Sequence, residues 1–385
     1  MKICAIICEY NPFHNGHCYH LQAAKAATGA DFLLCIMSGN FIQRGEAAIF
    51  EKHERARHAI LGGADAVIEL PTVFATSNAE LFAKGAIKIL SSIHEVTALS
   101  FGAESATAEQ LINAANLLND EPKDVSEKIQ AELTRGVSYA KALSIGWQDR
   151  IPAEILNSPN NILALEYAKA VLTYRPDIAL CPVKRIGGNY NDETLKETFS
   201  SATAIRKALK ENADDNRHAN ALPDFVPKTM NANLHTRLKT AENFAILTTA
   251  AETVARTLDC TEGLENALIK AVKNGETEIA ETLTSTRYTT SRLKRILLQN
   301  ALLIREKDIR DALNSSLYLK VLAIKKESES LLSVFGNANA PSIVRPRDEE
   351  KLTEVAKTAY AIDQFADDFY ALLSGKATVD KPIFV

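Results

Sequence analysis

The sequence predicts an α/β protein in which a doubly wound parallel sheet is followed by an α-helical domain. Through the first 210 residues, short apolar runs alternate with helix-like segments, a pattern typical of parallel βαβ units with right-handed crossovers. Beyond that point strand-like runs almost disappear, and segments with a helical period take over. The length of 385 residues exceeds that of a typical single domain. We therefore expect one domain over residues 1–210 and a helical domain over 211–385.

Five short apolar runs are the expected strands. Each is nearly continuous in apolar residues, as a strand buried on both faces is. In chain order they are Lys2–Glu9, Asp31–Met37, Asp65–Leu70, Val96–Phe101 and Asp177–Val183. The expected helices between them are His17–Ala27, Glu51–Leu61 and Leu81–Leu90. Glycines follow the first two helices, at the position where helices commonly end.

The second half of the chain begins with a linker or an irregular domain edge. Residues 211–228 are polar, contain proline and follow no period. Segments with a helical period then occur at Ala241–Leu258, Leu264–Ala271, Ser291–Leu303, Ser315–Ala323 and Glu349–Leu373.

The composition is that of an ordinary globular protein. Apolar residues make up 46 % and charged residues 24 %, and the formal net charge is −4, so the whole-chain charge does not indicate a polyanionic partner, although a local patch would suffice to bind one. No apolar stretch approaches the ~18 residues of a membrane span, and the opening segment lacks a signal-peptide pattern. The six cysteines form no C-x-x-C pair, which favours buried reduced thiols. We expect a soluble, cytoplasmic protein.

The segment Asn11–His17 carries the strongest chemical signal. It lies between the first strand and the first helix, where doubly wound folds commonly bind phosphate against the positive end of the helix. Gly16 lets the backbone approach a phosphate closely. His14 and His17 supply donors that can neutralise charge on an α-phosphate and on leaving pyrophosphate, and they are the catalytic candidates. Zinc binding by these two histidines and His20 is the alternative, which we disfavour because no cysteine or carboxylate completes the set.

The H-N-G-H turn resembles the H-x-G-H signature of the nucleotidyltransferase superfamily. The longer string Ile7–His20 is similar to that of one family within it, the bacterial tRNA(Met) cytidine acetate ligases. Further segments that resemble this family are Met37–Glu46, Ser100–Glu104, Pro159–Leu163, Arg185–Gly187, Ser201–Arg206 and Tyr288–Arg295. The Ser201–Arg206 segment looks like the second motif of the superfamily, Ser-x-Thr-x-x-Arg.

The resemblance implies an enzyme that activates acetate with ATP as acetyl-adenylate. The acetyl group then passes to the exocyclic amine of the wobble cytidine of elongator tRNA(Met), which gives N4-acetylcytidine. Mg²⁺ is expected to accompany ATP, because it seldom needs a dedicated protein cage. The implied ATP contacts are Ile7, Cys8, Glu9, Tyr10, Asn11, Pro12, Phe13, His14, Asn15, Gly16, His17, Cys18, Tyr19, His20, Gly102, one of Asn160 and Asn161, and Arg185. Thr203 and Arg206 join them at an expected helix start, another position that accepts anions.

Two further sets of basic residues are candidates for the remaining substrates. Arg44, in the loop after the second strand, is the first candidate partner for the acetate carboxylate or a phosphate. The basic stretch 287–310 is either a solvated helix face or a tRNA contact, and its candidates are Arg287, Arg292, Lys294 and Arg295.

Two alternative functions stay open. One is a nucleotidyltransferase of the same superfamily that acts on a small molecule, and the other is a non-catalytic tRNA-binding protein.

Overall fold

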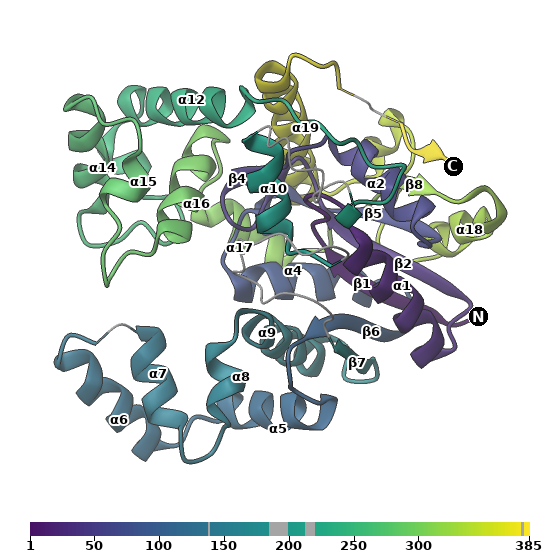
Figure 1. Ribbon diagram of the computed structural model, residues 1–385, viewed down its shortest axis with the longest axis horizontal. Helices are drawn as coiled ribbons and strands as arrows, with labels where there is room; N and C mark the ends of the chain where they lie inside the picture. Colours follow the sequence, from purple (N-terminus) through teal and green to yellow (C-terminus); the bar gives the residue numbers. More distant parts are fainter. Residues whose placement is uncertain (138, 185–198, 212–219, 379–380) are drawn as a thin grey trace.

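A central sheet organises the protein (Figure 1). The computed structural model describes residues 1–137, 139–184, 199–211, 220–378 and 381–385. The strand order of the sheet is β10-β8-β5-β2-β1-β6-β7, with the short strand β9 paired to β8. The bounds of its strands are β1 Ile3–Cys8, β2 Phe32–Ser38, β5 Ala66–Leu70, β6 Val96–Ala103, β7 Ala179–Lys184, β8 Leu319–Ile324, β9 Ser342–Ile343 and β10 Ile383–Phe384. A separate hairpin joins β3, Phe41–Ile42, to β4, Glu46–Ala47.

All five predicted strands are confirmed, and they pair with one another in parallel. They are β1, β2, β5, β6 and β7, and the strand order reverses at β1, with β2 and β5 on one side and β6 and β7 on the other. In a doubly wound sheet, such a reversal opens a crevice beyond the carboxyl ends of the strands. The turn after β1 therefore lies where the fold provides space for a ligand.

Helices cover both faces of the sheet in the first half of the chain. Their bounds are α1 Asn15–Thr28, α2 Lys52–Leu61, α3 Thr72–Ala75, α4 Ala79–Ser91, α5 Ala108–Asn119, α6 Lys123–Thr134, α7 Tyr139–Trp147, α8 Ala153–Asn157, α9 Pro159–Tyr174 and α10 Ala202–Lys210. Alternate residues of β1 point to opposite sides, so Ile3 and Ala5 join one hydrophobic core while Cys4 and Ile6 join the other. Each face of the sheet thus has its own packed layer.

A helical lobe, defined here as residues 234–301, extends from the sheet (Figure 1, green). Its helices are α12 Leu234–Thr248, α13 Ala251–Val254, α14 Leu264–Lys273, α15 Ile279–Thr282 and α16 Thr290–Ala301. A small core of its own holds the lobe together and includes Ile246, Leu268 and Ile296. The single helix expected over Ala241–Leu258 is interrupted at Thr249, where the backbone is extended. Among the described residues, no helix combines the length and the apolar character needed to cross a membrane.

The segment Ser315–Ala323, expected as a helix, contains strand β8 instead. That prediction was wrong because a short apolar run fits either a strand or a helix, and here the antiparallel pairing of this segment with β5 makes it a strand. The remaining elements are α17 Glu306–Asn314, η1 Lys326–Ser328, α18 Leu331–Gly336, η2 Pro346–Lys351 and α19 Glu354–Ser374. The part of the chain after the helical lobe thus packs on the sheet, and the division into two domains at residue 210 stays a prediction.

Candidate active site

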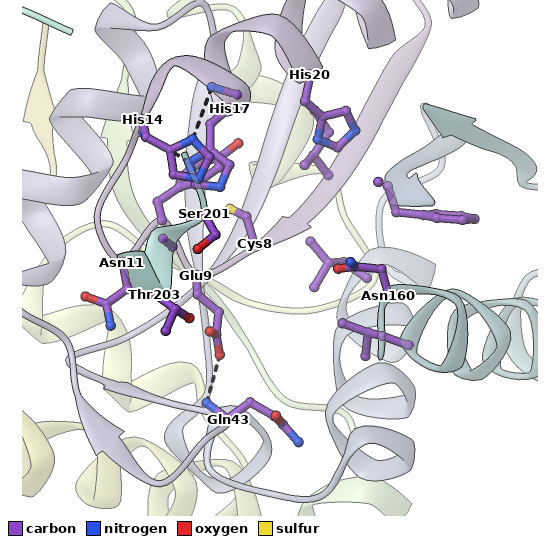
Figure 2. Close-up of a pocket in the computed structure, with 18 of the residues that line it drawn as sticks. Cys8, Glu9, Asn11, His14, His17, His20, Gln43, Asn160, Ser201 and Thr203 are labelled. Atoms are coloured by element: carbon purple, nitrogen blue, oxygen red, sulfur yellow. Dashed lines mark hydrogen bonds between the residues drawn. The ribbon is translucent and has the colours of Figure 1, made fainter. Parts of the chain in front are cut away.

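A cavity of about 230 Å³ opens beyond the carboxyl ends of β1, β6 and β7. Its walls come from the turn after β1, from α1, α4, α9, the β3–β4 hairpin and the start of α10. Figure 2 shows His14 and His17 at one end, Gln43 at the opposite end and Asn160 on a third side. The reversal of strand order at β1 thus places the predicted motif segments around one space.

His14 and His17 cap the first helix and stack on each other. Nδ1 of His14 accepts a hydrogen bond from the backbone N–H of Gly16 at 3.1 Å, and Nδ1 of His17 accepts one from the backbone N–H of His14 at 3.2 Å. The ring centroids lie 3.7 Å apart. Because both Nδ1 atoms accept, each neutral ring carries its proton on Nε2 and acts there as a donor. Gly16 has a steric role as well, since a Cβ there would lie 2.9 Å from the His14 ring.

Buried aromatic rings pack against this turn on its core side. Tyr10 lies edge-on to Phe13 with ring centroids 4.9 Å apart, and its ring centroid lies 4.7 Å from that of His17. His20, one turn further along α1, shares a hydrogen bond of 3.0 Å with the Ser100 hydroxyl in β6. The first helix is therefore fixed to the sheet on both sides of the histidine pair.

The cavity receives most of the predicted ATP-binding residues. Those that line it are Ile7, Cys8, Glu9, Tyr10, Asn11, His14, Gly16, His17, Tyr19, His20, Gly102, Asn160, Thr203 and Arg206. Those that the structure places outside its lining are Pro12, Phe13, Asn15, Cys18 and Asn161. Phe13 is fully buried beneath the histidines, and the Asn15 amide donates to the backbone of Asn220 at 2.8 Å. Arg185 lies outside the described residues.

The two neighbouring asparagines at the start of α9 have separate surroundings. Asn160 lines the cavity and donates from Nδ2 to the Glu104 carboxylate at 2.6 Å. Asn161 is fully buried, accepts from the Glu104 N–H at 3.1 Å and donates to the Glu154 carbonyl at 2.9 Å. Asn161 therefore fixes the loop after β6, while Asn160 faces the ligand space.

The start of α10 forms a second anion-receptive wall. The Ser201 hydroxyl caps this helix by accepting from the Ala204 N–H at 3.0 Å, and Thr203 in its first turn lines the cavity. Arg206 donates to the Asn11 carbonyl at 2.7 Å and to the Thr203 hydroxyl at 3.3 Å. Two helix N-termini, those of α1 and α10, thus face the same space, and each contributes partial positive charge.

A carboxyl group marks the opposite end of the cavity. Glu9 follows β1, and its Oε1 accepts from the backbone N–H of Gln43 at 2.8 Å. Burial raises the pKa of this carboxyl, although the Gln43 N–H and the positive charge of Arg44 oppose the rise. Arg44 lines the same end, as its prediction as an acetate or phosphate partner requires. Nδ2 of the buried Asn11, which also lines the cavity, has no hydrogen-bond partner among the described residues.

Arg55 is a positioning residue that the sequence reasoning missed. Its fully buried guanidinium donates to the backbone carbonyls of Glu9 at 2.5 Å, Ser38 at 3.2 Å and Phe50 at 3.0 Å, and also to that of Gly39. It thereby ties the end of β1 to the end of β2. Burial lowers the pKa of Arg55 from its ordinary value. The available signal was the helical period, because Arg55 lies four residues before the buried Ala59.

Several apolar and polar lining residues also escaped the sequence reasoning. Leu163 and Tyr167 follow Asn160 at three and seven residues, so one face of α9 lines the cavity, and this spacing was a usable signal. Tyr167 packs against Phe101 with ring centroids 5.7 Å apart. The other lining residues that were not predicted are Ile6, Ile42, Gln43, Phe82, Phe101, Val183, Lys184, Phe199, Ser200, Ser201 and Ala202.

The four basic residues predicted to contact tRNA lie on or just before α16, outside the cavity lining. Arg287 is exposed and pairs with Glu262, and Arg292 donates to the Asp259 carbonyl at 3.0 Å. Lys294 pairs with Glu46 of the β3–β4 hairpin at 3.0 Å. Burial lowers the pKa of Arg295, which lies beside this hairpin at Gly45. Helix α16 is therefore in direct contact with the hairpin whose loop carries Arg44.

The described residues contain no group of three or more His, Cys, Asp or Glu side chains that is placed to hold a metal ion. In the histidine turn, the Nδ1 atoms of His14 and His17 accept hydrogen bonds from backbone N–H groups.

Comparisons with known proteins identify the family of this chain. The family model for HIGH nucleotidyl transferases matches residues 1–381. Proteins named tRNA(Met) cytidine acetate ligase are similar over most or nearly all of the chain. That of Thermoanaerobacter sp. (strain X514) is 35 % identical over 384 residues, covering 97 % of this chain and 95 % of the relative. That of Clostridium novyi (strain NT) is 39 % identical over 316 residues, or 78 % of each chain.

Solved structures of Thermotoga maritima TmcAL are similar throughout. The apo form superposes with a TM-score of 0.90, and the form bound with alpha-thio ATP with a TM-score of 0.88. Both are 26 % identical in sequence, and each comparison covers 100 % of both chains. On the family model and on the full-length relatives, this chain belongs to the HIGH nucleotidyl transferases and, within them, to the tRNA(Met) cytidine acetate ligase family.

Proposed function

We propose that this protein activates acetate with ATP to acetyl-adenylate and then acetylates the exocyclic amine of the wobble cytidine of elongator tRNA(Met), forming N4-acetylcytidine. The observation that carries the proposal is one shared cavity, in which the His14–His17 pair and the start of α10 face an end that holds the Glu9 carboxyl and Arg44. The names of the relatives support the choice of substrates, and the ATP analogue bound by the Thermotoga protein supports the nucleotide.

In this proposal the donor end of the cavity holds the phosphates. Nε2 of His14 and of His17 donates to oxygens that gain charge as acetate attacks the α-phosphate and pyrophosphate leaves. Thr203 and the α10 N-terminus bind the phosphates, and Gly102 and Asn160 lie beside the adenosine. Mg²⁺ would be held by the phosphates rather than by a protein cage, and it would neutralise part of their charge. Arg44 is the proposed partner of the acetate carboxylate.

The tRNA is proposed to lie across the cavity mouth and the helical lobe. Arg287, Arg292, Lys294 and Arg295 remain the candidate phosphate contacts, and Arg287 has the most exposed side chain in the ion pairs they form. Contacts of this kind position an RNA without reading its sequence. A cytoplasmic location forms part of the proposal, and the six unpaired cysteines fit a reducing compartment.

Pyrophosphate release with acetate and ATP, with and without tRNA(Met), tests the proposal when it is followed by nucleoside analysis of the tRNA. We expect acetate-dependent release and N4-acetylcytidine in the wild-type protein. His17→Ala should abolish the release, because it removes a donor to the developing charge, while leaving the fold intact. Release without a modified nucleoside would favour a small-molecule acceptor. ATP binding without any release would favour a non-catalytic tRNA-binding protein.

A further inference from the structure

The two ends of the cavity are chemically different, and the proposed activation of acetate leaves one group unused. His14, His17 and the α10 N-terminus form a donor-rich end that suits phosphates. Glu9 lies at the other end beside Gln43, and a carboxylate there would repel phosphate oxygens. The charge of Glu9 is therefore better suited to a ligand that presents a hydrogen-bond donor.

Glu9 is held in place, yet its carboxylate keeps capacity to accept. Oε1 takes the Gln43 N–H at 2.8 Å, and among the described residues this is the one hydrogen bond that reaches the carboxylate. The backbone of Glu9 is fixed by Arg55, which donates to its carbonyl at 2.5 Å. The side chain is only half-buried because it opens into the cavity. An ionised carboxylate offers about four acceptor positions, so Oε2 can receive a donor from a ligand.

The electrostatic surroundings suit a proton acceptor. Burial raises the pKa of Glu9, while the Gln43 N–H and the guanidinium groups of Arg44, Arg206 and Arg55 oppose the rise. These arginines approach from three elements, the β3–β4 hairpin, α10 and α2. A carboxyl whose ionised form is supported by such donors can accept a proton from a ligand.

We propose that Glu9 accepts a hydrogen bond from the exocyclic amine of the target cytosine and takes its proton during acetyl transfer. This inference rests on the proposed function. The amine of cytosine is a donor that glutamate recognises in other nucleic-acid complexes. Its nitrogen attacks the acetyl carbonyl carbon of acetyl-adenylate, and a C–N bond forms. The C–O bond to the phosphate breaks, AMP leaves with the electron pair, and the proton from nitrogen passes to Glu9 and later to solvent.

The substitution Glu9→Gln separates this role from nucleotide binding. Glutamine keeps the size of the side chain and an oxygen for the Gln43 N–H, but it cannot take a proton. Acetate-dependent exchange of pyrophosphate into ATP, measured in the same variant, reports the effect of the substitution on the first half-reaction. Relative to that effect, single-turnover acetyl transfer to tRNA(Met) should fall by a further factor of about 10² to 10⁴, the usual contribution of a general base.

Glu166→Gln is the matched control. Burial raises the pKa of Glu166 as it does that of Glu9, but Glu166 pairs with Lys169 on α9 and does not line the cavity. Both half-reactions should proceed in this variant as in wild type. The role of Glu9 is overturned if Glu9→Gln transfers acetyl within about tenfold of wild type, or if it loses exchange and transfer equally. Absence of both half-reactions in the wild-type protein would instead remove the proposed function, and the role of Glu9 with it.

The pH dependence gives an independent readout. Wild-type single-turnover transfer should fall as the pH drops through the pKa of Glu9, because the protonated carboxyl can no longer accept. Since burial raises that pKa, the fall should be centred above the ordinary glutamate pKa of 4.5. The Glu9→Gln variant should lack this acid limb. An identical limb in the variant would contradict the inference.

Discussion

Asn160 and Asn161 are adjacent in the chain, but their side chains have different surroundings and different roles. The Asn160 side chain faces the ligand space, whereas the amide of Asn161 is buried and bonded to the loop after β6 and to the Glu154 carbonyl. Asn160→Ala should weaken ATP binding by about five- to tenfold, the value of one lost hydrogen bond, and cost at most about 1 kcal/mol of stability. Asn161→Ala leaves buried partners unpaired and should cost about 2–3 kcal/mol in the free energy of unfolding.

Titration calorimetry with ATP and urea denaturation of both variants check this pair. Each variant serves as the control of the other, because the two substitutions remove the same amide from neighbouring positions. An Asn161→Ala protein of wild-type stability with weakened ATP binding would reverse the assignment.

The sequence could identify this asparagine pair only as a unit. The choice between its members depends on the rotation of α9 about its axis, which is set by packing of Asn161 under the loop after β6. Arg55 shows the same limit, since a buried guanidinium bonded to backbone carbonyls has no sequence pattern of its own. The His14–His17 pair was predictable because a strand, a turn and a helix start coincide there within a few residues.

At the scale of elements, the β3–β4 hairpin connects the cavity to the helical lobe. Gly45 at its tip has a φ of +75°, and a Cβ there would lie 2.5 Å from the backbone nitrogen of Arg295 in α16. Gly45→Ala should therefore lower the free energy of unfolding by about 2–4 kcal/mol. The loss combines the strain of a left-handed alanine with overpacking against backbone that cannot move aside. The hairpin should also shift and carry Arg44 with it, which should slow acetate-dependent pyrophosphate release.

Gly275→Ala is the matched control for this prediction. Gly275 has a similar φ of +83°, but a Cβ there would meet nothing within 4 Å. Gly275→Ala should lower the free energy of unfolding only by the backbone strain, about 1–2 kcal/mol, and should leave pyrophosphate release unchanged. Urea denaturation and the pyrophosphate assay on both proteins separate strain from contact. Equal losses in both variants would show that the hairpin–α16 contact contributes nothing.

The elements that sequence reasoning identified are those with local signals. Strands β1, β2, β5, β6 and β7 were identified because buried parallel strands are continuous apolar runs. The hairpin strands have two residues each, too short for any period. Strand β8 was assigned to a helix because its partner β5 lies more than 200 residues earlier, and a sequence window does not contain that contact.

At the scale of the whole molecule, a buried ionic cluster joins the first part of the sheet, at Lys52 and Glu69, to the part of the chain after the helical lobe. Glu69 of β5 contacts Lys52 of α2 at 2.9 Å and Lys320 of β8 at 2.8 Å. Both lysines also pair with Asp367 of α19, and the neighbouring Asp363 accepts from the Tyr318 hydroxyl at 2.6 Å. This cluster anchors the part of the chain after the helical lobe to the sheet, near the end of β2 that Arg55 holds.

The cluster makes stability depend on pH in a calculable direction. Burial alone would raise the pKa of Glu69, but the ammonium groups of Lys320 and Lys52 lower it to about 2. The ionised Glu69 carboxylate therefore contributes its full share to stability when the pH is above 4.5, the ordinary glutamate pKa. That contribution is lost as the pH falls toward about 2. Asp363 acts in the opposite sense. Burial and the charge of Glu69 raise its pKa to about 6, so its contribution is lost as the pH rises through that value.

Glu69→Gln should destabilise the protein by about 3–5 kcal/mol at pH 7, because it removes one of the two carboxylates that Lys52 and Lys320 share and leaves both buried lysines to Asp367. As Glu69 itself becomes protonated in wild type, the difference between the two proteins should shrink below pH 4.5 and approach zero near pH 2. Urea denaturation between pH 3 and 7 measures this difference. Glu354→Gln, which removes an exposed carboxylate paired with Lys357 on α19, should leave the free energy of unfolding essentially unchanged. A Glu69→Gln difference that stays constant down to pH 3 would mean that packing, not the ionic cluster, anchors the last segment of the chain to the sheet.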